Sequence, residues 1–157
     1  SIGFTVAQGE TRATFSGGET ETALQTGTTA GTITLRIVSN SDTLSIAIPA
    51  TPVVVDMARG TRTSSGLDIE LTGFDNTRSV SQLRFQFFDR NGRAIGSGPV
   101  SVDAGANFRS FFEASALGGL FSLRASFPVS GDASQIAGAE VELVNSAGST
   151  RSQRIQF

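Results

Sequence analysis

Apolar and polar residues alternate with a period of two along most of the chain. A clear example is the run of Leu83, Phe85 and Phe87, which are separated by polar residues. The same alternation recurs at residues 33–38, 44–48, 67–72, 121–127 and 140–144. Strands with one apolar and one polar face are typical of antiparallel sheets that have one side in water. The pattern therefore predicts an all-β protein built as an antiparallel β-sandwich.

The last hairpin of the chain contains a turn that is rich in small residues. A three-residue loop at 147–149 places Val141 opposite Ile155. It also places Glu142 opposite Arg154, so that apolar residues face each other and opposite charges face each other. The sequence therefore predicts this register for the final two strands.

One segment departs from the strand pattern and shows helical spacing. Its apolar residues are Phe108, Phe111, Phe112 and Leu117. Asn107 is a suitable N-cap, and the glycines at 118–119 are suitable as a stop signal. We expect one short helix at residues 108–117, lying across one end of a sheet with its Phe side chains closing the core.

A boundary is expected where two prolines occur within four residues, at Pro49 and Pro52. Proline ends a strand and keeps the following backbone extended. Residues 52–157 hold about seven strands, which suits a complete sandwich of the immunoglobulin or fibronectin type III kind. Residues 1–49 hold about four or five, which is too few for an independent sandwich. We therefore expect a sandwich at 52–157 and a smaller, incomplete β unit at 1–49.

Two segments of the N-terminal part carry a family resemblance. The run 24–35, followed by 44–49, resembles the closing strands of bacterial Ig-like modules, which recur in large secreted or cell-surface proteins. Residues 4–6 and 13–15 look like the strands that precede this ending, and residues 140–148 look like a penultimate strand and hairpin. The resemblance implies an Ig-like or fibronectin type III-like fold in both parts, an extracellular or cell-surface location, and a structural or adhesive role without catalytic residues.

The first residue is Ser1 rather than Met. This is compatible with a removed leader or with a segment of something longer, and we favour the second explanation. The opening strands of the first Ig-like unit are then missing because the boundary falls inside that unit. If Ser1 is instead a native start, a neighbouring subunit would supply them.

The composition removes most of the side chains that perform chemistry near neutral pH. The chain has no Cys, His, Trp or Tyr, and all 12 basic residues are Arg. It therefore lacks an imidazole, a lysine amine and a thiolate, the usual soft metal ligand. The net charge of −2 gives no reason to bind nucleic acid, and no apolar run is long enough to span a bilayer. We expect no enzymatic activity, no cofactor and no membrane insertion.

Two carboxylate pairs are the candidates for acid–base chemistry. Asp68 lies two residues before Glu70, and Glu140 lies two residues before Glu142, each pair on the polar side of a strand. A glycosidase uses two carboxylates across a sugar bond, whereas a strand face uses them to stay soluble. We favour the second interpretation, because no nearby residue type would raise the pKa of either carboxyl group.

The remaining candidates are a polar loop and a set of arginines. In the loop 73–78, Asp75 and Asn76 could bind a hard cation, but an Asx turn explains the same residues more simply. The arginines that could surround an anionic ligand are Arg84, Arg90, Arg93, Arg109 and Arg124. We favour ordinary pairing with surface acids for them.

These observations predict a non-catalytic structural or adhesive module. Its partners would be neighbouring domains of the same protein or other copies of itself, and a small-molecule ligand is not expected. One alternative is a filament subunit completed by strand exchange, with Ile2, Phe4 and Val6 on the inserting strand. A second alternative is a carbohydrate-binding module, in which a Phe such as Phe88 on an outer strand face would contact sugar, although Trp and Tyr are the usual platforms.

Overall fold

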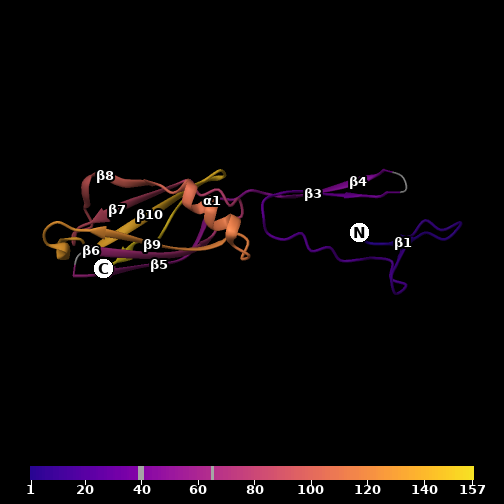
Figure 1. Ribbon diagram of the computed structural model, residues 1–157, viewed down its shortest axis with the longest axis horizontal. Helices are drawn as coiled ribbons and strands as arrows, with labels where there is room; N and C mark the ends of the chain where they lie inside the picture. Colours follow the sequence, from indigo (N-terminus) through magenta and orange to yellow (C-terminus); the bar gives the residue numbers. More distant parts are fainter. Residues whose placement is uncertain (39–40, 65) are drawn as a thin grey trace.

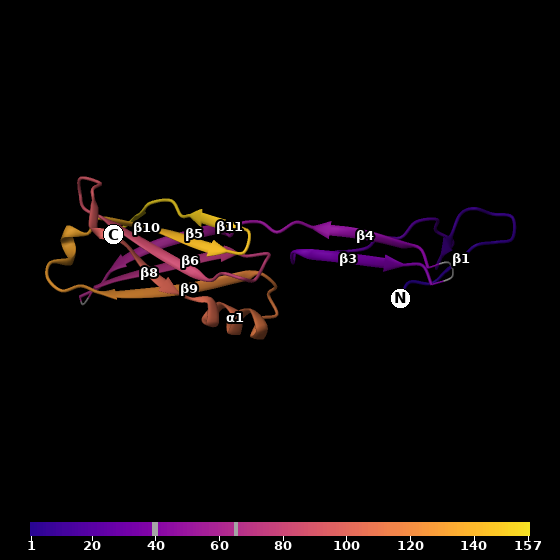
Figure 2. The same ribbon diagram turned by 90° about the horizontal axis from the view of Figure 1, so that it is seen from above.

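The computed structural model describes residues 1–38, 41–64 and 66–157. All strand pairings among these residues are antiparallel. One α-helix and one short 3₁₀ helix, η1 (Ala133–Gln135), accompany the strands. Figures 1 and 2 show an elongated molecule with the C-terminal strands stacked at one end and the N-terminal strands extending away from them. The prediction of an all-β, sandwich-like fold is confirmed.

The first sheet of the sandwich has the strand order β5-β6-β9. Its strands are β5 (Val54–Arg62), β6 (Gly66–Phe74) and β9 (Leu120–Pro128). In β6, the alternating Leu67, Ile69 and Leu71 are buried, whereas Glu70 is exposed. The period-two pattern therefore turns one side of this sheet toward the core.

The second sheet contains the remaining strands of the C-terminal part. They are β7 (Gln82–Phe88), β8 (Ala94–Asp103), β10 (Gly138–Asn145), β11 (Gly148–Arg151) and β12 (Ile155–Gln156). The order is β11-β10-β7-β8, and β12 also pairs with β10. Phe85 lies opposite Val141 and Leu83 lies opposite Leu143, and all four side chains are buried. These pairs form the inner side of the second sheet.

The core lies between the two sheets. The rings of Phe85 on β7 and Phe127 on β9 meet edge to face, with 4.8 Å between their centroids. All buried hydrophobic side chains of the described residues lie between Val53 and Ile155. The hydrophobic stabilisation of the protein therefore comes from the sandwich.

The helix α1 (Gly105–Ala114) begins and ends three residues before the predicted helix at 108–117. Asn107 lies inside the helix rather than capping it, and Leu117 lies beyond the end with 67% of its surface exposed. The predicted boundaries were wrong, because the spacing of apolar residues identifies the buried face of a helix but not its first residue.

The buried face of α1 closes one end of the core. Phe108 and Phe112 lie four residues apart and are 7% and 2% exposed. Phe108 meets the ring of Phe121 on β9 edge to face, with 5.2 Å between the centroids. Phe111 points away and is 40% exposed. The expected contribution of the helix to the core is confirmed for two of its three Phe residues.

The register of the last hairpin differs from the prediction. The turn between β10 and β11 has two residues, so that Glu142 faces Arg151 rather than Arg154. Ile155, on β12, lies opposite Ala139 of β10 rather than opposite Val141. The two-residue turn causes this difference, and its register continues to Ser152, whose backbone N donates to the Val141 carbonyl at 2.8 Å. Between β11 and β12 the register shifts by one further residue, and Ile155 remains buried.

The described residues of the N-terminal part, 1–38 and 41–49, contain four strands. They are β1 (Phe4–Thr5), β2 (Thr14–Phe15), β3 (Gly31–Arg36) and β4 (Thr43–Ile48). β3 and β4 form a ribbon in which Ile33 faces Ile46 and Leu35 faces Leu44. These apolar residues share one face, yet Leu44 is 60% exposed. Within residues 1–38 and 41–52 no hydrophobic side chain is buried.

Candidate functional site

Three buried polar residues gather where residues 49–52 join the sandwich. Asp75 follows β6, Asn76 is its neighbour, and Asn145 ends β10. They are 0%, 7% and 6% exposed. We term these three residues the junction network, because their hydrogen bonds connect the sandwich to the chain that precedes it.

Asp75 is the acceptor at the centre of this network. Its Oδ1 accepts hydrogen bonds from the Thr77 backbone N at 2.9 Å and from the Thr77 hydroxyl at 2.6 Å. Its Oδ2 accepts from the backbone N of Ser79 at 2.7 Å and of Val80 at 3.0 Å. The bond to Thr77 N closes the predicted Asx turn, which is confirmed. Both carboxylate oxygens are thus used by donors of the protein itself.

The two asparagines attach the preceding chain to this loop. Asn145 Nδ2 donates to Asp75 Oδ1 and to the Thr51 carbonyl, both at 2.9 Å. Asn76 Nδ2 donates to the Pro49 carbonyl at 2.8 Å, and its Oδ1 accepts from Thr51 N at 3.0 Å. Residues 49–51 are therefore bonded both to the loop after β6, through Asn76, and to the end of β10, through Asn145.

A further backbone bond reaches the start of β3. Ala30 N donates to the Asn76 carbonyl at 2.8 Å. Asn76 therefore contacts the chain on both sides of the β3–β4 ribbon, through its side chain at Pro49 and through its backbone at Ala30. This arrangement fixes the base of the ribbon at two points.

The electrostatics of Asp75 predict a stability change in acid. Burial raises the pKa of Asp75, but hydrogen bonds from Thr77, Asn145 and Ser79 lower it more, so that it lies below the usual value of 3.8. The ionised form therefore stabilises the fold above about pH 4, and this contribution is lost as pH falls through the folded-state pKa. We expect the free energy of unfolding, measured by chemical denaturation from about pH 4 to about pH 2, to fall less steeply in Asp75→Asn than in the parent. Equal slopes would contradict the assignment.

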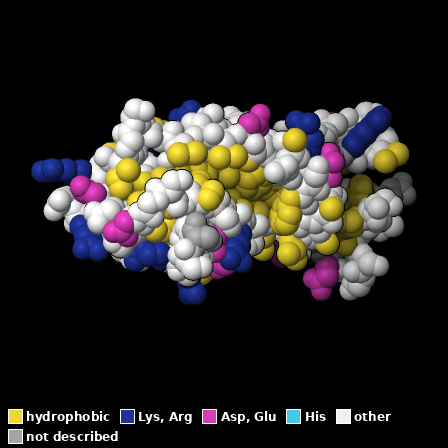
Figure 3. All heavy atoms as spheres, turned by 60° about the vertical axis from the view of Figure 1, so that its left-hand side comes forward, with side chains coloured by type: hydrophobic (Ala, Val, Ile, Leu, Met, Phe, Trp, Pro, Cys, Tyr) yellow, Lys and Arg dark blue, Asp and Glu magenta, His cyan; other side chains and the backbone are white. Residues whose placement is uncertain are grey.

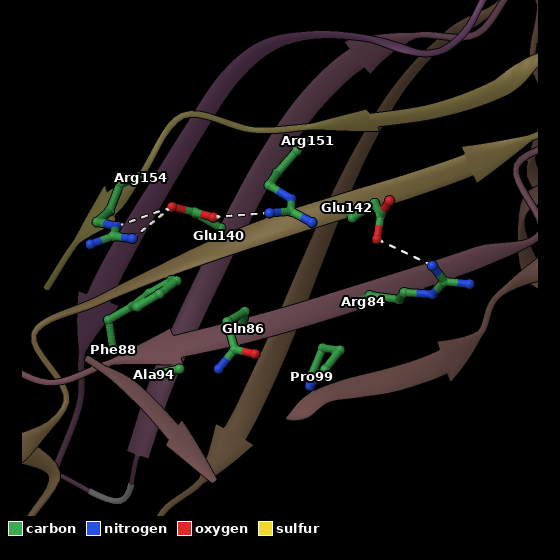
Figure 4. Close-up of a pocket in the computed structure, with 9 residues that line it drawn as sticks. All are labelled: Arg84, Gln86, Phe88, Ala94, Pro99, Glu140, Glu142, Arg151 and Arg154. Atoms are coloured by element: carbon green, nitrogen blue, oxygen red, sulfur yellow. Dashed lines mark hydrogen bonds and ion pairs between the residues drawn. The ribbon is translucent and has the colours of Figure 1, made fainter. Parts of the chain in front are cut away.

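The second candidate site is the charged outer face of the second sheet (Figure 4). Arg84 on β7 pairs with Glu142 on β10 at 3.3 Å. Glu140 pairs with Arg154 at 2.9 Å and with Arg151 at 3.7 Å. Each glutamate of this predicted carboxylate pair is thus matched by arginine, in a row of alternating charges across neighbouring strands.

A shallow hollow of 390 Å³ lies over this charged row. Its apolar lining includes Phe88, which is 9% exposed. The Arg154 guanidinium covers the Phe88 ring at 3.7 Å from its centroid. Phe88 lies on the outer face as expected, but the expectation that it is exposed was wrong, because this cation–π contact covers the ring that a sugar would need.

The other predicted carboxylate pair lies on the first sheet. The Ser126 hydroxyl and the Arg124 guanidinium lower the pKa of Asp68. Arg124 donates to Asp68 Oδ2 at 2.5 Å, and Ser126 donates to Oδ1 at 2.6 Å. Glu70 is exposed on the same strand. The lowered pKa keeps Asp68 ionised, so it is unsuited to donate a proton.

The five arginines that were candidates for surrounding an anionic ligand are dispersed. Arg84 belongs to the second sheet and Arg124 to the first, each paired with a carboxylate. Arg90 and Arg93 lie at the turn between β7 and β8, and Arg109 lies on α1. The structure therefore confirms surface pairing for two of them. Arg151 and Arg154, near the end of the chain, lie with Arg84 on the charged outer face of the second sheet.

The predicted assembly residues lie in the part of the chain farthest from the sandwich. Ile2, Phe4 and Val6 are 55%, 41% and 51% exposed. Phe4 pairs with Phe15 across the two-residue strands β1 and β2, with 6.1 Å between ring centroids. Their apolar side chains are thus largely in contact with solvent in the single chain.

The described residues contain no group of three or more acidic side chains that could hold a metal ion. Within the same residues, no helix has the length and apolar character needed to cross a membrane.

Comparisons with known proteins give no match: no protein-family model, no curated protein and no solved structure matches the chain.

The part of the site that sequence reasoning missed is the role of Asn145. In the sequence, Asn145 is a plausible turn residue, and in the structure its Oδ1 does accept from Ala147 N at 3.0 Å. Its amide nitrogen, however, bonds Asp75, which lies 70 residues earlier. The turn at Asn145 could therefore be recognised from the sequence. Its bond to Asp75 could not, because it forms only when the sheets that contain β6 and β10 pack together.

Proposed function

We propose that this chain is a non-catalytic, extracellular structural or adhesive module of a bacterial surface protein. Residues 52–157 form its Ig-like or fibronectin type III-like sandwich, and residues 1–49 form a smaller Ig-like unit that precedes it. The observation that carries this proposal is the junction network, which holds residues 49–51 by side-chain hydrogen bonds. A module that sets the spacing and direction of its neighbours needs such a fixed connection.

The order of the strands supports the Ig-like part of the proposal. Numbering from β5, the first, second and fifth strands form one sheet, and the third and fourth strands join the sixth, seventh and eighth in the other. In Ig domains the A, B and E strands share a sheet, and the C and C′ strands join F and G. The correspondence leaves the D position without a strand, since α1 occupies that part of the chain.

The charged surfaces support the absence of catalysis. Asp68 is held by Arg124, and Glu140 and Glu142 are held by arginines of the second sheet. Catalytic carboxyl pairs need environments that separate their pKa values. Ion pairs on a solvent-facing sheet serve solubility and contribute about 0–1 kcal/mol each.

The proposal predicts that Asn76→Ala loosens the connection between the ribbon and the sandwich. The chain has no native Cys, so spin labels can be attached at two introduced cysteines, Thr34→Cys on β3 and Ser122→Cys on β9. We expect a narrow distribution of label distances by pulsed electron resonance in the parent. The distribution should become at least about twofold broader in Asn76→Ala, because three hydrogen bonds to Pro49 and Thr51 are lost.

Asn91→Ala is the matched control, because it removes an exposed asparagine from a turn of the sandwich. The distribution in this variant should equal that of the parent. A parent distribution as broad as that of Asn76→Ala would contradict a fixed connection.

A further inference from the structure

Two valines on β8 point toward the interior of the sandwich but are only partly covered. Val100 lies opposite Phe85, and Val102 lies opposite Leu83. Residues directly opposite in an antiparallel pair point to the same side of the sheet. Phe85 and Leu83 are 1% and 6% exposed, whereas Val100 and Val102 are 47% and 39% exposed. The inner side of β8 is therefore only partly covered by the described residues.

The cause is the different width of the two sheets. The first sheet ends at β9, which pairs with β6 alone among the described strands, while the second sheet continues from β7 to β8. On the inner side of β9, Leu123, Ala125 and Phe127 are only partly buried. Among the described residues, the edge of β9 that faces away from β6 thus has no strand paired with it.

A hollow marks one end of this edge. It measures 220 Å³ and is lined mainly by Phe108 and Phe111 of α1 and by Phe121 and Leu123 of β9. Figure 3 shows hydrophobic side chains gathered in a continuous band on one face of the molecule. We term the surface made by β8, β9 and Phe111 the β8–β9 groove. A free strand edge beside an apolar surface is suited to receive an extended peptide.

We infer that the β8–β9 groove receives residues 2–6 of a second copy of this chain, paired with the free edge of β9. Ile2, Phe4 and Val6 would point inward and cover Val100 and Val102. This inference goes beyond the proposed structural role, which stands whether or not copies assemble.

The chemistry of residues 2–6 matches the groove. Its apolar side chains are two residues apart, as are Leu123, Ala125 and Phe127 on β9, so that both strands would present the same period to the interior. No side chain from Ser1 to Gly9 is charged, so insertion buries no charged side chain. The segment is available, because its own strand β1 has only two residues.

The geometry favours a second copy over the chain's own N-terminus. Figures 1 and 2 place β1 at the far end of the molecule from the sandwich. A strand that leaves one copy at one end and enters the next copy at the other makes a head-to-tail contact, which continues into open chains. Direct pairing of β9 with β9 of a second copy is disfavoured, because each β8 overhangs the position that the partner's sheet would fill.

The test uses the full chain and two complementary variants. Phe4→Ser removes the central apolar side chain of the inserting segment but keeps the groove. Val100→Ser combined with Val102→Ser alters the groove but keeps the segment. Val54→Ser is the matched control, because Val54 is 50% exposed on β5, outside both surfaces. The measurement is sedimentation velocity from about 1 μM to about 1 mM.

We expect the mass of the parent and of Val54→Ser to rise with concentration through a series of multimers. The association of each test variant alone should be at least about tenfold weaker than that of the parent. An equal mixture of the two should form dimers and nothing larger, because only one kind of contact remains. The inference is overturned if the parent stays monomeric, if either variant assembles like the parent, or if the mixture forms no dimers.

Discussion

Asp75→Ala is expected to lower the free energy of unfolding by about 3–5 kcal/mol. The substitution removes the acceptor of three backbone N–H groups, those of Thr77, Ser79 and Val80, and of the Asn145 amide. Because this region is buried, water cannot fully replace the lost acceptor, and each unsatisfied donor is costly. Urea denaturation at neutral pH measures the change.

Asp56→Ala provides the comparison for this prediction. Asp56 is an exposed aspartate on β5, so its removal should change the free energy of unfolding by no more than about 0.5 kcal/mol. If Asp75→Ala were as mild as Asp56→Ala, the junction network would not be a stabilising element of the sandwich.

Phe112→Ala is expected to cost about 3–5 kcal/mol of unfolding free energy. Phe112 is 2% exposed and packs against Phe108 and Phe121, with centroid distances of 5.8 Å and 6.3 Å. Its truncation leaves a cavity where α1 meets the core, and the surrounding rings can fill that cavity only in part. The loss should appear as a lower denaturation midpoint with an unchanged urea dependence.

The adjacent Phe111 is a control of the same residue type on the same helix. Phe111 is 40% exposed, so Phe111→Ala should cost about 1 kcal/mol or less. Similar losses in the two variants would mean that α1 is not oriented with Phe112 toward the core.

Much of the sandwich could be predicted from the sequence, because several of its strands follow a period of two. In β6 and β10 the alternation of Leu67, Ile69 and Leu71 and of Val141 and Leu143 corresponds directly to buried positions. This pattern is local and needs no knowledge of the partner strand. It therefore identified the strands without identifying their order.

The details that failed concern the places where the backbone turns. The register of the last hairpin changed because its turn has two residues rather than three, a difference that alternation does not encode. The boundaries of α1 shifted because Phe108 and Phe112 must reach the core from a helix that begins directly after β8. In both cases, the sequence indicated which side chains are buried but not where the backbone turns.

The candidate site was only partly predictable, because it depends on contacts between distant segments. The Asx turn was recognisable within the predicted loop 73–78, since Asp75 precedes Thr77 by two residues, although β6 extends through Phe74. Its connection to Asn145, Thr51 and Pro49 could not be predicted, because those residues come close only when β6, β10 and the preceding chain are assembled. The strands β3 and β4 were likewise predicted from the sequence. The exposure of the apolar face of the ribbon that they form was not predicted.

¹⁵N relaxation of the intact chain, at a concentration where it is monomeric, measures directly whether the junction network fixes the ribbon to the sandwich. A fixed connection at the junction network predicts that amides of β3 and β4 and amides of the sandwich share one strongly anisotropic rotational diffusion tensor. Separate, faster tumbling of the β3–β4 ribbon would contradict the central claim that the chain acts as a single extended structural module.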